Sequence, residues 1–176
     1  MKSSILTFFA GLVVLLFHTH SAQSAAVELD LSRQTRPLFF VVTSPTADPS
    51  TKEQANRLAN QLTAISGAKF LLTEDSMDAG IYVGTITDFP ETGFNLSAND
   101  ANRVHEYVLK SMETGLYIIG ASPSAVESAV SHVLRHINAQ HFPEGTISKT
   151  TNRIRIAIDH TESTSFTLPK LIWSDN

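Results

Sequence analysis

Two histidines four residues apart form the clearest chemical pattern in the sequence: His132 and His136, in the segment His-Val-Leu-Arg-His. On one face of a helix this spacing lets two imidazoles share a metal, as in zinc hydrolases. The glutamate of the HExxH motif is missing, because Val133 stands in its place. A helical phase puts His132 about 130° from the centre of the apolar stripe. We therefore expect two solvated or boundary histidines, and the alternative is a metal-dependent hydrolase with His141 as a third ligand.

Acidic and aromatic side chains are the other candidates for chemistry. A glycosidase needs two carboxylates roughly 5–10 Å apart across the scissile bond, but Glu74, Asp75 and Asp78 fall in one turn, where acidic residues are ordinary. Four aromatic residues could stack on sugars: Tyr82, Tyr107, Tyr117 and Trp173. The three tyrosines fall within expected strands, so we interpret them as core or cross-strand residues. No G-x-S-x-G motif and no phosphate-cradling glycine loop occurs. The sequence thus assigns no catalytic residue, metal ligand or cofactor.

The second half of the chain contains the best-defined structural unit. Alternating segments on either side of Glu113-Thr114-Gly115 predict a β-hairpin, 104–109 with 116–119. Ser122 and Pro123 then supply a cap and a first-turn proline for a helix over Pro123–Asn138. Its apolar residues form one stripe that suits packing on a sheet: Val126, Ala129, Val130, Val133, Leu134 and Ile137.

The first half predicts a second helix, over Thr51–Ser66, with a capping box of Ser50 and Glu53 and a left-handed cap at Gly67. The solid apolar run in 37–43 predicts a strand buried on both faces. Other strands are expected at 27–31, 68–72, 80–84 and 154–158, with a turn at 142–145. Residues 85–103 are predicted to be a long surface loop with a short helical turn near 98–102. The expected fold is α+β: a mixed sheet of about six or seven strands covered by two main helices.

Composition and the N-terminal segment limit the classes of protein to which this chain can belong. The chain has 176 residues and a formal net charge of −4, and 42% of its residues are hydrophobic. These values fit one globular domain, and the lack of a basic run disfavours nucleic acid as a partner. Lys2, the apolar run 5–17 and the small residues 21–26 predict a secretory signal peptide over 1–26, cleaved after Ser24 or Ala26. The apolar run is too short to span a membrane. There are no cysteines, so neither disulfides nor a cysteine-linked lipid is expected.

The order of these elements resembles a known family. The segments that carry the resemblance are 55–68, Ile81-Tyr-Val-Gly84, Glu106-Tyr-Val-Leu, Leu116 to Pro123, and Phe142-Pro143. Together they are similar to the non-catalytic α/β domain that precedes the TIM barrel in family 20 β-N-acetylhexosaminidases and family 67 α-glucuronidases. Residues 169–176 look like the linker and first barrel strand. The catalytic carboxylates of those families lie in the barrel, so the resemblance assigns none here.

The sequence and the resemblance together predict a signal peptide at 1–26, an accessory domain at 27–160, and a linker with the start of an absent barrel strand at 161–176. The expected function is a secreted or periplasmic, non-catalytic accessory domain of glycoside-hydrolase type. Its expected partners are a glycan or a catalytic barrel. The alternative is a free-standing module that binds a polysaccharide or a protein through the 85–103 loop. Asn95-Leu96-Ser97 is a glycosylation sequon.

Overall fold

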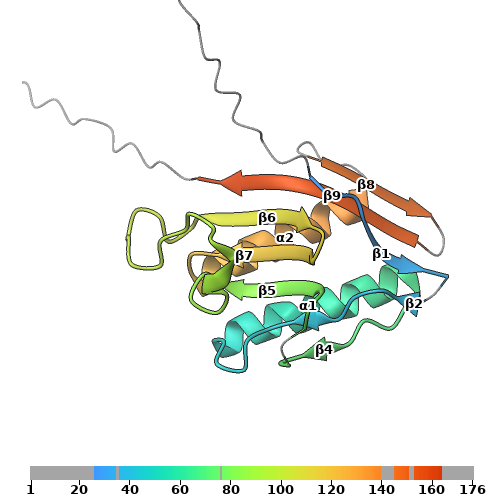
Figure 1. Ribbon diagram of the computed structural model, residues 1–176, viewed down its shortest axis with the longest axis horizontal. Helices are drawn as coiled ribbons and strands as arrows, with labels where there is room; N and C mark the ends of the chain where they lie inside the picture. The colour runs from blue at the N-terminus through green and yellow to red at the C-terminus, as the bar shows by residue number, and fades with distance from the viewer. Residues whose placement is uncertain (1–25, 35, 76, 140–144, 151–152, 164–176) are drawn as a thin grey trace, which may run out of the picture.

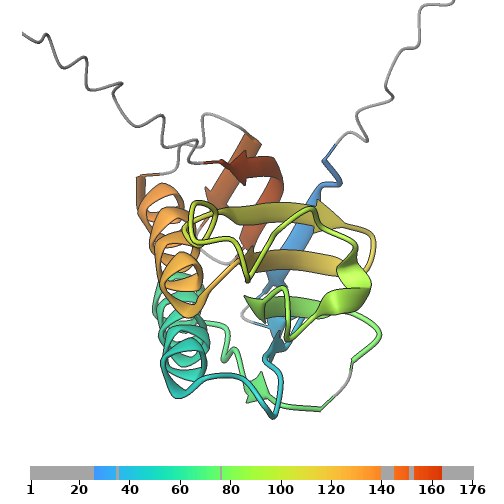
Figure 2. The ribbon, with the colours of Figure 1, turned by 90° about the vertical axis from the view of Figure 1, so that its left-hand side faces the viewer.

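The computed structural model describes residues 26–34, 36–75, 77–139, 145–150 and 153–163, and it describes side chains for residues up to 137 and from 154 onward. Within these ranges nine strands form one mixed sheet in the order β2-β1-β9-β6-β7-β5-β3-β4, with β8 paired to β9. Two helices cover the same face of this sheet (Figures 1 and 2). The predicted α+β class is confirmed, with more strands than the six or seven expected.

The strands differ greatly in length. They are β1 (Leu29–Arg33), β2 (Arg36–Pro37), β3 (Val41–Val42), β4 (Leu72–Thr73), β5 (Gly80–Thr85), β6 (Tyr107–Met112), β7 (Gly115–Gly120), β8 (Gly145–Thr150) and β9 (Arg153–Glu162). The helices are α1 (Pro49–Ser66), α2 (Pro123–Ala139) and the short 3-10 helix η1 (Pro90–Thr92).

The sheet is parallel in one half and antiparallel in the other. Strands β4, β3, β5 and β7 run parallel to one another, whereas the pairs β7–β6, β6–β9 and β9–β1 are antiparallel. The predicted β6–β7 hairpin is confirmed, and it joins the two halves of the sheet. Parallel strands end at the same edge, so the residues that follow β3, β4 and β5 are brought together there.

Both helices begin and end close to the predicted residues, but a different residue from the predicted one caps the N-terminus of α1. The side chain of Asp48, rather than Ser50, is the cap, and its Oδ1 accepts a hydrogen bond from the backbone N of Ser50 at 2.8 Å. The predicted capping box of Ser50 and Glu53 is therefore wrong, because Pro49 already occupies the first turn and moves the helix start two residues earlier. Gly67 does adopt the left-handed conformation predicted for the C-terminal cap, with φ of 73°.

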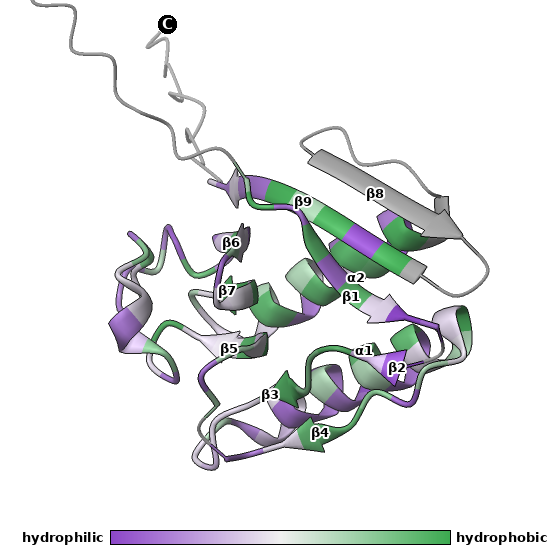
Figure 3. Cartoon of the chain, turned by 45° about the vertical axis from the view of Figure 1, so that its right-hand side comes forward, coloured by the Kyte–Doolittle hydropathy of each residue, from purple (hydrophilic) through white to green (hydrophobic). Residues whose placement is uncertain are grey.

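Two apolar clusters lie on opposite faces of the sheet. The larger one fills the space between the sheet and the helices and includes the predicted α2 stripe. The smaller one lies on the face without helices, where Phe89 and part of the following loop pack on Val42, Tyr82 and Ile119. Figure 3 shows the alternation of apolar and polar residues on the helices and on β9 that this packing requires. Long-loop residues thus cover part of the second face in place of a helix layer.

The apolar run at 37–43 does not form one strand buried on both faces. Leu38 and Phe40 are 50% and 42% exposed, and only Val41 and Val42 are in a strand. The reason is that the run joins two parts of the sheet: Leu38 N donates to Leu31 O of β1 at 3.0 Å, whereas Val41 pairs with β4 and β5. A continuous apolar pattern cannot show such a change of partner.

Other differences concern loops and short strands. The strand predicted at 68–72 is reduced to Leu72–Thr73, and the one predicted at 154–158 runs over Arg153–Glu162 and pairs with β8, which was not predicted. The 85–103 loop has its helical turn at Pro90–Thr92, and hydrogen-bonded turns replace the one expected near 98–102. Residues 1–25 of the predicted signal peptide, residues 164–176 and His141 lie outside the described residues, as does most of the turn predicted at 142–145. No described helix is both long and apolar enough to span a membrane.

Candidate functional site

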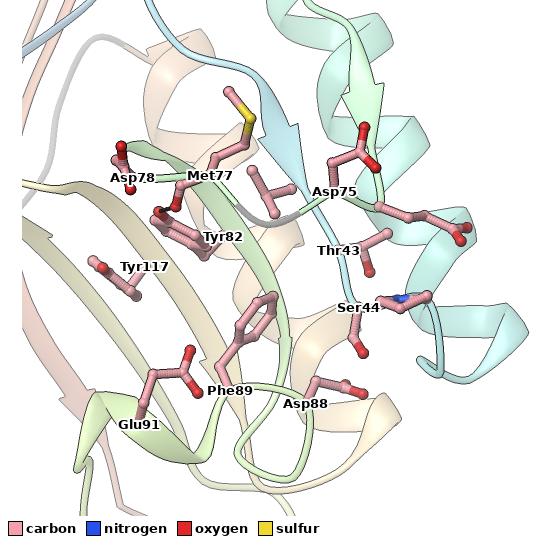
Figure 4. A pocket seen from close by; sticks show the side chains of 13 residues that line it. Thr43, Ser44, Asp75, Met77, Asp78, Tyr82, Asp88, Phe89, Glu91 and Tyr117 are labelled. Carbon is pink, nitrogen blue, oxygen red and sulfur yellow. Dashed lines mark hydrogen bonds between the residues drawn. The ribbon is translucent and has the colours of Figure 1, made fainter.

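A hollow of about 580 Å³ lies on the face of the sheet without helices, where β3, β4 and β5 end (Figure 4). We call it the strand-end hollow. Thr43 and Ser44 follow β3, Glu74 and Asp75 follow β4, and the segment after β5 contributes Asp88, Phe89 and Glu91. In sheets of parallel strands, ligands bind outside the carboxyl ends of the strands, and this volume suits a small ligand.

Three aromatic rings form one wall of the hollow. Tyr82 of β5 is in register with Tyr117 of β7, and their rings stack with centroids 4.6 Å apart and an angle of 15° between the planes. The ring of Phe89 meets Tyr82 edge-on at 5.7 Å. Gly84 permits this approach, since a Cβ at that position would lie 2.5 Å from the Phe89 ring. The two tyrosines are cross-strand partners, as the sequence predicts.

The hydroxyl of Tyr82 is fixed within this wall. It donates a hydrogen bond to the carbonyl oxygen of Met77 at 2.8 Å. Burial is the main cause that raises the pKa of Tyr82 above its ordinary value of 10.0, and the neighbouring Tyr117, Asp78 and Glu91 raise it further. Tyr82 is thus a neutral hydrogen-bonded side chain, and the partly exposed Tyr117 is the ring that a ligand in the hollow can contact.

Five carboxylates surround the hollow: Glu74, Asp75, Asp78, Asp88 and Glu91. Asp88 is the most constrained, because it accepts hydrogen bonds from the backbone N and the Oγ1 of Thr85 at 2.8 and 2.7 Å. Glu74 pairs with Lys52 Nζ at 2.8 Å. No lysine or arginine is among the described residues that line the hollow, so its lining is strongly acidic.

Thr43 is the most unusual residue of the lining. Its side chain is 1% exposed, and Oγ1 has no hydrogen-bond partner among the described residues. A buried hydroxyl left unpaired costs about 1–3 kcal/mol, so native proteins seldom keep one without a reason. A ligand group that reaches this hydroxyl would recover part of that cost.

The histidine pair lies elsewhere, at the junction of α2 with β6 and β9. His132 is buried, and it shares a hydrogen bond of 2.7 Å with the hydroxyl of Tyr107. The rings of His136 and His160 lie 4.7 and 4.9 Å from the ring of His132. The expectation of a solvated or boundary position is therefore wrong for His132, because Tyr107 and His160, from two neighbouring strands, extend the buried side of α2 beyond its apolar stripe. His136 is partly exposed, as expected of a boundary histidine. Among the described residues, no group of three or more histidine, aspartate or glutamate side chains is placed to hold a metal.

The structure separates the remaining sequence candidates. Glu74, Asp75 and Asp78 join Tyr82 and Tyr117 in the strand-end hollow. Tyr107 is on the opposite face of the sheet, in the core under the helices. Asn95 of the sequon is exposed, in the loop that continues from η1. Trp173 lies outside the described residues.

Sequence reasoning missed Thr43, Asp88, Phe89 and Glu91 as members of one site. The sequence did contain a pattern that could have indicated this site, because polar residues directly follow the apolar part of a strand, as in Val42-Thr43-Ser44. Such positions meet in space only if the strands are parallel neighbours. The pairing of β3 with both β4 and β5 is a property of the tertiary structure.

Comparison with known proteins gives little beyond the fold. No family model and no curated protein matches the sequence. Among solved structures, the chain is similar to a family GH115 4-O-methyl-α-glucuronidase with specificity for decorated arabinogalactans, at 16% identity and a TM-score of 0.47. The match covers 73% of this chain but only 18% of that one. This structure is a glycoside hydrolase, which agrees with the sequence resemblance at that coarse level, and it does not support the two specific families named from the sequence. A likeness this distant carries no argument about function.

Proposed function

We propose that this protein is a non-catalytic carbohydrate-binding domain of glycoside-hydrolase type, and that it binds saccharide in the strand-end hollow. The observation that carries the proposal is the unpaired, buried hydroxyl of Thr43 in a hollow with an aromatic wall and an acidic rim. The resemblance of the sequence to accessory domains of glycoside hydrolases points to the same class of ligand.

The chemistry of the hollow suits a polyhydroxylated ligand. A sugar offers apolar C–H faces to an aromatic ring and many hydroxyl donors to carboxylates. Tyr117 supplies a partly exposed ring, whereas Asp75 and Asp88 lie on the Thr43 side of the hollow and Asp78 and Glu91 on the tyrosine side (Figure 4). Hydrogen bonds to charged acceptors are worth about 1.5–3 kcal/mol, more than those to neutral ones. A saccharide seated between these groups would satisfy several of them at once.

The same carboxylates are poorly placed for glycoside hydrolysis. A glycosidase holds its acid in an apolar environment and opposes it with a second carboxylate on a rigid element. Here Glu74, Asp75, Asp78 and Glu91 are exposed, and none of them lies within a strand or an α-helix. Asp88 is less exposed, but the hydroxyl and amide of Thr85 hold it as an acceptor. We therefore expect no turnover of aryl N-acetylhexosaminides or aryl glucuronides. Turnover that disappears when one of these carboxylates is neutralised would contradict this part of the proposal.

Two buried threonines allow a matched test of binding. Thr43 and Thr51 are 1% and 0% exposed, and neither Oγ1 has a hydrogen-bond partner among the residues that the structure describes, but only Thr43 lines the hollow. Valine replaces the hydroxyl by a methyl group of similar size, so both Thr43→Val and Thr51→Val should leave the thermal midpoint unchanged or raise it. Isothermal titration calorimetry of the purified chain with a panel of neutral and amine-bearing oligosaccharides should detect binding. Thr43→Val should raise the dissociation constant about threefold to tenfold. Thr51→Val should bind as the unmodified chain does. Equal affinities in the two variants, or no binding of any saccharide, would refute the proposal.

Secretion is part of this proposal and rests on the predicted signal peptide. N-terminal sequencing of protein recovered from the culture medium or the periplasm should find a start between Ser24 and Val27. An exported chain that keeps residues 5–17 would show that the segment is not a cleaved leader.

A further inference from the structure

We infer that the strand-end hollow selects saccharides with a free amine, such as glucosamine oligomers, over N-acetylated, neutral or uronic-acid saccharides. This inference rests on the proposed function and names its class of ligand. Three observations carry it: an acidic rim on which Lys52 pairs with one of five carboxylates, an aromatic wall, and the buried hydroxyl of Thr43, which has no partner among the described residues.

The first step of the argument is electrostatic. Lys52 pairs with only one of the five carboxylates, and no described lysine or arginine lines the hollow. A cleft with charges of one sign concentrates ligands of the opposite sign. An ammonium group is attracted both by carboxylates and by the face of a tyrosine ring. A uronic acid brings a carboxylate of its own and is repelled.

The second step concerns the arrangement of the carboxylates. If they converged on one point, an inorganic cation would satisfy them. No set of three or more acidic or histidine side chains among the described residues is placed to hold a metal. The carboxylates instead lie on both sides of the hollow (Figure 4), with Asp78 near the tyrosines and Asp88 near Ser44. Separated charges around a volume of about 580 Å³ suit an organic ligand that carries both an ammonium group and hydroxyls.

The third step assigns roles within the hollow. Asp78 and Glu91 lie on the tyrosine side of the hollow, beside the stacked rings of Tyr82 and Tyr117 (Figure 4). An ammonium group next to Tyr117 would be reached by these two carboxylates. Thr43 lies on the other side and is suited to a sugar hydroxyl. The amine and the hydroxyls of one ligand are thus recognised by different parts of the lining.

The test compares four trisaccharides that differ mainly in charge: glucosamine, N-acetylglucosamine, glucose and glucuronic acid oligomers. Isothermal titration of the purified chain at pH 6 should show the glucosamine trimer binding at least about tenfold more tightly than the others, since a hydrogen bond between charged groups is worth about 1.5 kcal/mol or more. Asp78→Asn and Glu91→Gln should each weaken this binding about threefold. Glu127→Gln, on the exposed side of α2, is the matched control and should have no effect.

A change of pH gives a second readout. Amines of this kind lose their proton at a pH of about 8, so the advantage of the glucosamine trimer should disappear between pH 6 and pH 9. The outcomes distinguish the two proposals. If all four trimers bind equally well and only Thr43→Val weakens binding, the selectivity inferred here is wrong and carbohydrate binding stands. If no trimer binds, both proposals fail.

Discussion

Replacing Gly115 by alanine should remove a large part of the stability of the domain. Gly115 begins β7, where it faces Gly80 of β5 in the register that also stacks Tyr117 on Tyr82. Its φ is +136°, a conformation that other residues rarely adopt, and a Cβ there would lie 1.8 Å from the carbonyl oxygen of Gly80. Ordinary contacts begin near 3.4 Å, so the β5 backbone would have to move by more than an ångström.

The cost follows from three effects. Backbone strain at such a φ costs about 1–3 kcal/mol, overpacking about 1–3 kcal/mol more, and the loss of a backbone hydrogen bond about 1 kcal/mol. The bond at risk joins Gly80 N to Thr114 O at 3.0 Å. A total of about 3–7 kcal/mol is a large part of the 5–15 kcal/mol by which domains are stable.

Thermal unfolding followed by circular dichroism measures this change, and Gly93→Ala is its control. Gly93 also has a positive φ, of +66°, but a Cβ there meets no described atom within 4 Å. Gly93→Ala should cost about 1 kcal/mol and lower the midpoint by about 2–4 °C, whereas Gly115→Ala should lower it by at least about 6 °C or prevent folding. Equal shifts in the two variants would show that β5 and β7 do not approach each other as described.

Three further predictions concern the helices. Asp48→Ala should lower the thermal midpoint more than Glu53→Ala, since Asp48 caps α1 and accepts hydrogen bonds from the Oγ and the backbone N of Ser50. A larger effect of Glu53→Ala would show that the capping box of Ser50 and Glu53 is the real cap. These two hydrogen bonds hold the pKa of Asp48 below its ordinary 3.8, so the stabilising effect of the cap should be complete above that pH and disappear as the pH falls through the lowered pKa; a stability difference between the unmodified chain and Asp48→Asn that persists at the lowest pH would contradict this. Leu134→Asp should unfold the domain, because it buries an unpaired carboxylate at a cost of several kcal/mol, whereas Arg135→Asp, on the exposed face, should be mild; similar midpoints would refute the packing of α2.

The sequence by itself determined the helices and the hairpin. Their boundaries depend on local chemistry: Pro123 in a first turn, Gly67 in a left-handed cap, and the turn at Glu113-Thr114-Gly115. The apolar stripe of α2 was also predictable, because a period of 3.6 residues leaves little choice about which face packs on the sheet.

Only the tertiary structure decided where strands pair and which side chains meet. The apolar run before Thr43 changes partners midway, so its pattern could not give the two-residue length of β3. His132 is buried because Tyr107 and His160, from two strands far away in the sequence, pack against it. The angular positions of residues around one helix contain no information about such neighbours. The strand-end hollow exists because β3, β4 and β5 are parallel neighbours and their last residues share an edge. Pairing between segments far apart in sequence is a non-local property. Only once that pairing is known does the Thr43 hydroxyl stand out as buried without a partner in the described part of the chain.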